Sequence, residues 1–118
     1  MVFAAKTNVV INLQFEGVHC WPACPIEEVA FLRSPHRHMF HVCCKKRVAH
    51  DDRDIEIIQL KRQVQKYIEE KYHGDLGSKS CEMLADELVL QFGLCYCSVL
   101  EDGENGAEVI SEPFTGSK

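Results

Sequence analysis

Apolar and polar residues alternate along two stretches in the first half of the chain. Apolar side chains occupy every second position from Val9 to Phe15, with mostly polar residues between them, and alternation returns from His36 to about Val48. A period of two is typical of a β-strand with one buried face. We therefore predict two strands, paired antiparallel as the simplest arrangement. The chain between them, Val18 to Pro35, is expected to be a loop with one short turn near residues 27–31.

The pattern changes to helical spacing in the second half of the chain. From Ile57 to Lys71, apolar residues recur every three or four positions and a charged side lies opposite them. This spacing predicts an amphipathic helix that ends near His73 and Gly74. A charged turn precedes it, and we expect the N-cap of the helix at Asp52 or Asp54.

A second, shorter helix and a β-hairpin are expected after this helix. The apolar stripe of the second helix runs from Leu84 to Phe92, with Ser78 or Ser80 as its N-cap and Gly93 after its last turn. Beyond it, two short apolar stretches flank a turn that contains Asn and Gly, which is typical of a hairpin. We expect strands at residues 94–101 and 107–110, the turn at 102–106 and a frayed tail at 113–118.

The expected order of elements is therefore ββααββ, in the α+β class. A four-stranded antiparallel sheet with both helices on one face would bury both apolar stripes. The edges of such a sheet and its other face would stay uncovered, and self-association into a barrel is the simplest way to cover them. We expect a single domain over residues 1–118, with an ordered core at about residues 8–111, that forms a homo-oligomer.

Composition excludes several classes of function. The chain has 118 residues and a formal charge of −5, which argues against binding to a nucleic-acid backbone. Its apolar runs are too short to cross a bilayer, and its first residues lack the apolar region of a signal peptide, so we expect a cytosolic protein that binds neither membranes nor nucleic acid. The seven cysteines show no zinc-finger spacing, so most are expected to be reduced and buried. Cys20 and Cys24 are candidates for chemistry because they lie near His19.

Three histidines are candidate metal ligands. His36 and His38 are two residues apart at the start of the second strand, so their side chains point to the same face. His19, near the end of the first strand, offers a third imidazole. Three imidazoles leave one tetrahedral position of a zinc ion open to water or substrate, as in catalytic zinc sites. His-x-His spacing alone is a weak signal, because a surface pair without metal shows the same spacing.

The order of the elements and the positions of these histidines resemble the 6-pyruvoyltetrahydropterin synthase and 6-carboxytetrahydropterin synthase family, which has the tunnelling fold, or T-fold. That family binds zinc through one histidine after its first strand and a His-Gly-His pair. His19, His36 and His38 match these positions, with Arg37 in place of the glycine. The resemblance covers about residues 8–111. Further blocks similar to family motifs are Glu56–Lys61, Lys79–Glu82 and Val99–Asp102.

The resemblance implies a zinc-dependent enzyme of pterin or deazapurine (queuosine) metabolism, assembled as a hexamer. Its reaction would be a carbon–oxygen elimination of triphosphate from dihydroneopterin triphosphate, or the related route to 6-carboxytetrahydropterin. Glu101 would accept two hydrogen bonds from the N–H edge of the ring, and Glu82 would support the ring. His73 would act as acid or base. Without the resemblance, Glu101 is an ordinary solvated carboxylate at a strand end, and Glu82 only complements a helix dipole.

Two departures from the family leave a second hypothesis open. The family's catalytic cysteine falls at Leu32, and the aspartate of its Asp-His dyad falls at Tyr72. Cys24 or Glu28 can replace the cysteine if the loop before the histidine pair folds back over the site. Otherwise the chain is a catalytically inactive T-fold protein that binds or sequesters a pterin-like or nucleotide-like ligand. A third option, an interaction domain without metal or ligand, requires the matches to be accidental.

Overall fold

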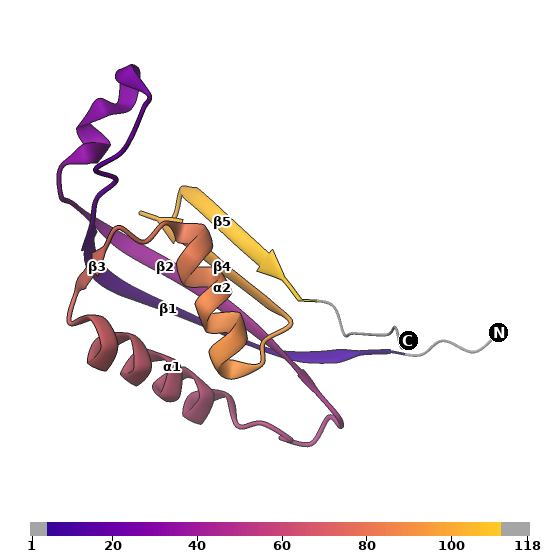
Figure 1. Cartoon of the computed structure of the whole chain (residues 1–118). Coiled ribbons are helices and arrows are strands. Elements are labelled where there is room, and N and C mark those ends of the chain that lie inside the picture. Colours follow the sequence, from indigo (N-terminus) through magenta and orange to yellow (C-terminus); the bar gives the residue numbers. More distant parts are fainter. Residues whose placement is uncertain (1–4, 112–118) are drawn as a thin grey trace.

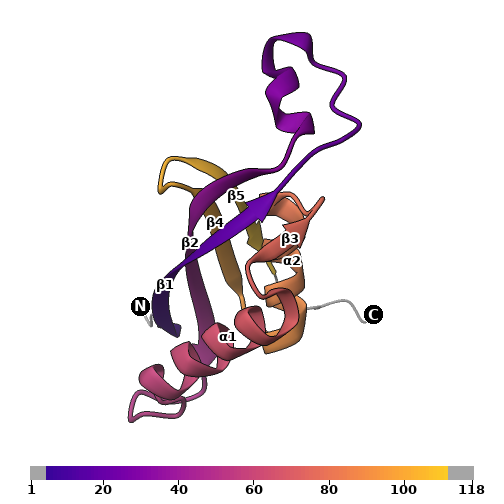
Figure 2. The ribbon, with the colours of Figure 1, turned by 90° about the vertical axis from the view of Figure 1, so that its left-hand side faces the viewer.

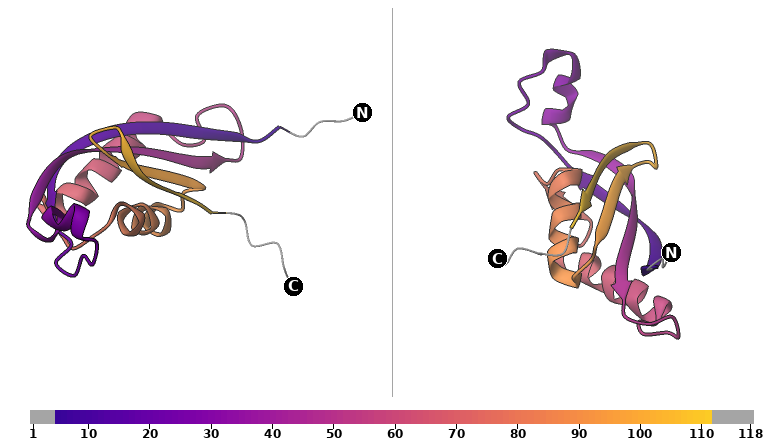
Figure 3. Two further views of the ribbon diagram at one scale, coloured as in Figure 1. Left: turned by 90° about the horizontal axis from the view of Figure 1, so that it is seen from above. Right: turned by 90° about the vertical axis from the view of Figure 1, so that its right-hand side faces the viewer.

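The computed structural model describes residues 5–111, and the tail expected at 113–118 lies outside this range. The fold is α+β, with one open five-stranded sheet in the order β3-β1-β2-β4-β5 and both α-helices on the same face of it (Figures 1 and 3). Within the described range, neither helix is long and apolar enough to cross a lipid bilayer. The elements in chain order are β1 (Thr7–His19), the 3₁₀-helical segment η1 (Glu27–Arg33), β2 (His36–Val48), α1 (Ile57–Tyr72), β3 (Asp75–Gly77), α2 (Cys81–Phe92), β4 (Tyr96–Glu101) and β5 (Asn105–Ile110).

The sheet is built on a long antiparallel hairpin of β1 and β2. The two strands pair along their whole length, from Thr7 opposite Val48 to His19 opposite His36. β4 continues the sheet beside β2, and β5 lies outside β4, both antiparallel. The predicted pairing of the first two strands is thus confirmed. The predicted start of the loop at Val18 is wrong, because cross-strand pairing continues to His19.

The prediction of four antiparallel strands is also wrong, because a short fifth strand runs parallel to β1. In β3, residues 75 and 77 pair with Val18 and His19. The N–H of Val18 donates to Gly74 O (2.8 Å) and the N–H of Cys20 to Gly77 O (2.9 Å). Three residues are too few to show alternation, so the sequence carried no signal for this strand. Its consequence is functional, since it anchors the end of β1 that carries His19.

The N-cap of α1 differs from the prediction. Glu56 caps the helix in place of Asp52 or Asp54, and its carboxylate accepts hydrogen bonds from the N–H groups of Ile58 (2.9 Å) and Gln59 (3.0 Å). These bonds hold the pKa of Glu56 below its usual range. Glutamate is a less common N-cap than aspartate, which explains why the charged turn suggested the wrong residue.

The remaining helix boundaries agree with the sequence analysis. Ser80 caps α2 by accepting a hydrogen bond from the N–H of Met83 (3.1 Å). His73 and Gly93 follow α1 and α2 in the left-handed conformation, with φ of 48° and 62°. This conformation lets the last turn of each helix close through a backbone hydrogen bond to the residue after it.

One core lies between the helices and the inner face of the sheet. The apolar stripes of α1 and α2 pack there against alternate residues of β1, β2 and β4. All seven cysteines lie within residues 5–111 and are free thiols, and four of them are buried. Between β1 and β2, residues 20–35 extend beyond the end of the sheet as an arm that contains η1 (Figure 2). The arm therefore stands directly above the histidine end of the hairpin.

Candidate metal centre

His19, His36 and His38 lie together at the end of the β1–β2 hairpin. His19 is directly opposite His36 in the register of the two strands, and His38 follows on the same face of β2. The ring centroids are 4.5 Å apart for His19 and His36, 5.0 Å for His36 and His38, and 5.5 Å for His19 and His38. Three imidazoles from distant parts of the chain thus form one histidine cluster. The alternation of side chains in β-strands is sufficient to bring them to one face.

Each imidazole is held in place by a contact from its Nδ1 atom to an oxygen. Because carbonyl and carboxylate oxygens only accept hydrogen bonds, each Nδ1 carries a proton, and in the neutral imidazole each Nε2 then keeps its lone pair. Such contacts behind the ring are the usual way in which proteins orient histidine ligands of a metal. The acceptors are Lys79 O for His19 (2.9 Å), Ser34 O for His36 (2.9 Å) and Asp102 Oδ2 for His38 (2.7 Å).

The three Nε2 atoms are buried and have no hydrogen-bond partner within residues 5–111. Leaving a buried polar atom without a partner costs about 1–3 kcal/mol, so three such atoms at one place need an explanation. Together with a carboxylate oxygen of Glu101, their ligand atoms all lie within 4.8 Å of one another. The histidine cluster and Glu101 can therefore hold a metal ion.

Glu101 ends β4 and lies close to the imidazoles. Its Oε2 is 3.0 Å from Nε2 of His19 and its Oε1 is 3.5 Å from Nε2 of His38. With neutral imidazoles protonated at Nδ1, both sides of these contacts are acceptors, so a cation between them would turn repulsion into attraction. The sequence analysis gave Glu101 a role at a heterocyclic ring. The structure also places it where it can be a fourth metal ligand.

Asp102 is a site residue that the sequence analysis missed. Its Oδ2 accepts the Nδ1 proton of His38, and its Oδ1 accepts a hydrogen bond from the N–H of Met39 (3.0 Å). The hydrogen bond from Met39, followed by that from His38, lowers the pKa of Asp102. Asp102 adopts a φ of 56°, which the turn between β4 and β5 requires. The sequence marked it as a turn residue, but only the pairing of β2 with β4 shows that it faces His38.

A cavity of about 470 Å³ opens beside the histidine cluster. Cys81 is a second residue that the sequence analysis missed: its thiol is buried, with Sγ 3.9 Å from Glu101 Oε2. Burial, and then the nearby Glu101 carboxylate, raise the pKa of Cys81 to about 12. The thiol is therefore protonated and donates toward Glu101. The cavity is lined by His19, Cys20, Trp21, Leu32, His36, Ser78, Lys79, Ser80, Cys81, Glu82, Met83, Glu101, Asn105 and Gly106.

The other candidates from the sequence divide between the cavity and more distant positions. Leu32, which stands where the similar family has its cysteine, lines the cavity, as does Glu82. Cys24 is 2% exposed inside the arm, with its thiol directed at carbonyl oxygens of the arm. Glu28 is exposed on η1, and His73 is exposed at the end of α1. The arm therefore does not bring Cys24 or Glu28 to the metal centre.

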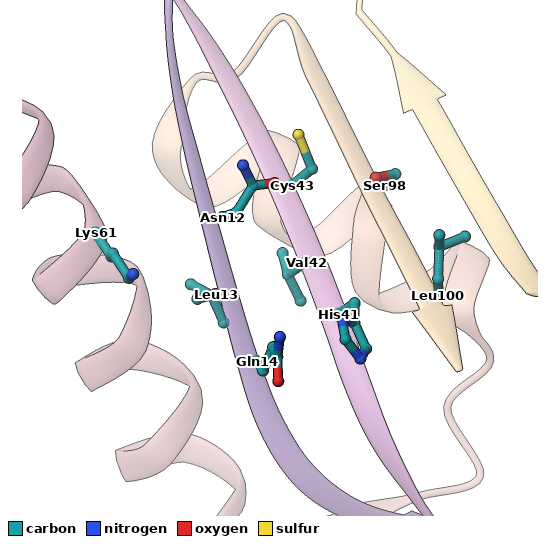
Figure 4. Close-up of a pocket in the computed structure, with 9 residues that line it drawn as sticks. All are labelled: Asn12, Leu13, Gln14, His41, Val42, Cys43, Lys61, Ser98 and Leu100. Carbon is teal, nitrogen blue, oxygen red and sulfur yellow. The ribbon is translucent and has the colours of Figure 1, made fainter. Parts of the chain in front are cut away.

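A second cavity of about 470 Å³ lies elsewhere on the sheet (Figure 4). Side chains from the uncovered face, among them Gln14, His41 and Cys43, line it together with Lys61 of α1. Volume does not distinguish the two cavities. The unpaired Nε2 atoms do, because within the described range such atoms occur only in the histidine cluster. We therefore place the candidate site at the metal centre.

Comparisons with known proteins assign no family to the chain. No protein-family model matches it, and no curated protein matches it at a significant level. A function for this protein is therefore inferred from its residues and their geometry.

Proposed function

We propose that this protein is a zinc-dependent T-fold protein of the 6-pyruvoyltetrahydropterin or 6-carboxytetrahydropterin synthase type. One observation carries the proposal: three buried Nε2 atoms without hydrogen-bond partners converge beside a carboxylate, and each ring is oriented from behind. Structural ion pairs and packed histidines satisfy their polar atoms, whereas metal ligands keep a lone pair available.

Zinc is the metal that we propose for this ligand set. Three imidazole nitrogens are borderline donors, which suit Zn²⁺ better than the hard cations Ca²⁺ and Mg²⁺, and they leave a fourth position open for substrate. A zinc ion bound there would supply Lewis acidity to hydroxyl or carbonyl oxygens of a substrate side chain. His19, His36 and His38 would hold the ion. The described residues thus fit the metal that the family resemblance implies.

The proposed substrate is dihydroneopterin triphosphate or a compound with a similar ring and side chain. Glu101 offers two acceptor oxygens to two adjacent N–H groups of the ring, while Cys81 and Glu82 lie beside it in the cavity. His73 is exposed at the end of α1 and is not among the residues that line the cavity, so we assign its acid–base role to the site of a neighbouring copy. A barrel-like homo-oligomer, as the resemblance implies, would supply that copy and cover the open sheet edges.

The second candidate function is binding without turnover, and specific contacts favour it. Leu32 provides no proton-transferring group at the position of the family's cysteine, although it lines the cavity. Tyr72, at the position of the family's aspartate, donates its hydroxyl proton to Glu87 (2.5 Å). A side chain engaged in this way contributes to the packing of α1 against α2, not to a catalytic dyad. Such a protein would sequester a pterin-like or nucleotide-like ligand.

One incubation separates the two functions. Zinc-loaded protein is mixed with dihydroneopterin triphosphate, and released triphosphate and recovered ligand are measured after denaturation. An enzyme produces triphosphate in amounts above that of the protein, whereas a binder returns the ligand unchanged. His36→Ala serves as the matched control, because it removes one proposed ligand of the metal. If the wild type retains neither zinc nor ligand, the proposed function is wrong.

A further inference from the structure

Trp21 lines the cavity beside the metal centre and is not part of the hydrophobic core cluster. It is the only tryptophan of the chain, it follows His19 by two residues, and its side chain is 44% exposed. An exposed indole offers a large, rigid, flat apolar surface. Flat aromatic side chains at the wall of a polar pocket commonly stack on the ring of a ligand.

The backbone around Trp21 is held firmly from two sides. The N–H of Trp21 donates to Leu32 O (2.6 Å), which joins the two ends of the arm, and its carbonyl accepts from the N–H of Cys24 (3.1 Å). The preceding residue, Cys20, donates its N–H to Gly77 O of β3 (2.9 Å). These bonds place the residue without using the indole. The backbone that carries the indole is therefore fixed in advance beside the cavity, which lowers the entropy lost when a ligand binds.

The lining of the cavity combines two kinds of surface. The imidazoles of His19 and His36 contribute metal-binding groups, whereas Trp21, Leu32 and Met83 contribute apolar surface. Met83 is 55% exposed, so it too presents apolar surface that the core does not use. A ligand that matches both kinds of surface has a flat ring and a side chain with oxygen atoms that can reach the metal.

We propose that Trp21 is the stacking wall for the planar heteroaromatic ring of the ligand, and that it sets the preference for a ring over an open-chain polyol. This inference rests on the proposed function and assigns to that site a specificity residue on the arm. The metal centre binds the oxygen-bearing side chain of the ligand. Trp21 binds the face of the ring and Glu101 its N–H edge, so the metal and the ring contribute separately to affinity.

The arm provides a matched control for Trp21. Phe31, on η1, is 69% exposed and is not among the residues that line the cavity. Both side chains are exposed aromatics of the same arm, so an effect of the arm on assembly would appear in both variants. An effect on ring binding would appear only in the variant of Trp21.

The experiment measures binding of neopterin, and of xylitol as a polyol without a ring, to zinc-loaded protein by calorimetry. We expect Trp21→Ala to weaken neopterin binding about 10-fold, since stacking of a base on an aromatic side chain contributes at that level. Trp21→Phe should lose about 3-fold, because a smaller ring keeps part of the stacking surface. Phe31→Ala should bind neopterin as the wild type does, and no variant should change its response to xylitol. Quenching of the single tryptophan by neopterin gives an independent readout.

Three outcomes would overturn the inference. They are wild-type affinity for neopterin in Trp21→Ala, an equal loss in Phe31→Ala, and no binding of neopterin to zinc-loaded wild type. Zinc content and light scattering are measured on the same samples. With normal zinc content, either of the first two outcomes refutes the role of Trp21 alone, whereas no neopterin binding by the wild type, or loss of zinc from it, refutes the proposed function as well.

Discussion

Two clusters of polar side chains meet near the start of α2, and they differ in how their atoms are satisfied. The first, which we call the Glu87 cluster, consists of the Glu87 carboxylate and its four donors, two at each oxygen. In the histidine cluster, the three Nε2 atoms have no hydrogen-bond partner within the described range. The donors to Glu87 are Tyr67 (2.6 Å) and Lys71 (2.7 Å) at Oε2, and Tyr72 (2.5 Å) and Lys79 (3.0 Å) at Oε1.

The difference separates a structural cluster from a ligand site. Burial disfavours the carboxylate form of Glu87, but hydrogen bonds from Lys71, Tyr67, Tyr72 and Lys79 outweigh burial and lower its pKa to about 2. A satisfied charge of this kind joins α1 to α2 and needs nothing further. The histidine cluster is oriented equally well from behind, yet its inward atoms lack partners. A bound cation would supply the missing partner.

One residue belongs to both clusters. The ammonium group of Lys79 contacts Glu87, while the carbonyl oxygen of Lys79 accepts the Nδ1 proton of His19. The segment between β3 and α2 therefore connects the helix pair to one candidate metal ligand. We therefore expect changes in the histidine cluster to lower zinc affinity and changes in the Glu87 cluster to lower stability. Each kind of change should have only a small effect on the other quantity.

The largest effect is expected from His36→Ala or His38→Ala. Each removes one of three proposed imidazole ligands, so the affinity for zinc should fall by more than about 100-fold. The helices should remain formed, because neither imidazole packs in the core cluster. Metal analysis and far-ultraviolet circular dichroism test both halves of this prediction. Zinc content at the wild-type level in either variant would remove the proposed site.

The next effect is expected on stability, from Glu87→Ala. Removal of the carboxylate leaves four donors without their acceptor, and loss of this acceptor from a partly buried network costs about 2 kcal/mol. Urea unfolding in the presence of a chelator measures this loss without a contribution from metal. A change below about 0.5 kcal/mol would show that the cluster is a solvated surface network, contrary to the comparison.

The same carboxylate predicts a dependence of stability on pH. The pKa of Glu87 is about 2 in the folded protein and 4.5 as its ordinary value. Its stabilising contribution is therefore fully present above pH 4.5 and is lost as the pH falls from there toward 2. In Glu87→Gln the side chain does not titrate, so this part of the acid loss should be absent. Parallel unfolding of the two proteins at pH 5 and pH 3 measures the difference, and equal losses would contradict it.

Most of the fold and the shared face of two histidines could be predicted from the sequence, but the contacts that complete the metal centre could not. Alternation and helical spacing predicted the β1–β2 hairpin, both helices and the shared face of His36 and His38. The short parallel strand β3 left no pattern, and it is β3 that anchors His19. Asp102 and Cys81 became site residues only through the pairing of β2 with β4 and the packing of α2 on the sheet. Spacing along the chain predicts a local face, whereas contacts between distant elements follow from the complete topology.

The smallest effects are expected from the residues whose oxygens accept the Nδ1 protons of the imidazoles. These variants test most directly whether the two clusters act separately. Asp102→Asn keeps an oxygen near His38 Nδ1 but removes the negative charge, so zinc affinity should fall about 10-fold. Lys79→Ala keeps the backbone carbonyl that orients His19 and removes only the contact with Glu87, so zinc affinity should change less than about 3-fold, with a loss of stability of about 1 kcal/mol. Competition with a chromophoric chelator measures both affinities. If Lys79→Ala weakened zinc as much as Asp102→Asn does, the two clusters would act as one unit, and the division between a structural cluster and a metal site would not hold.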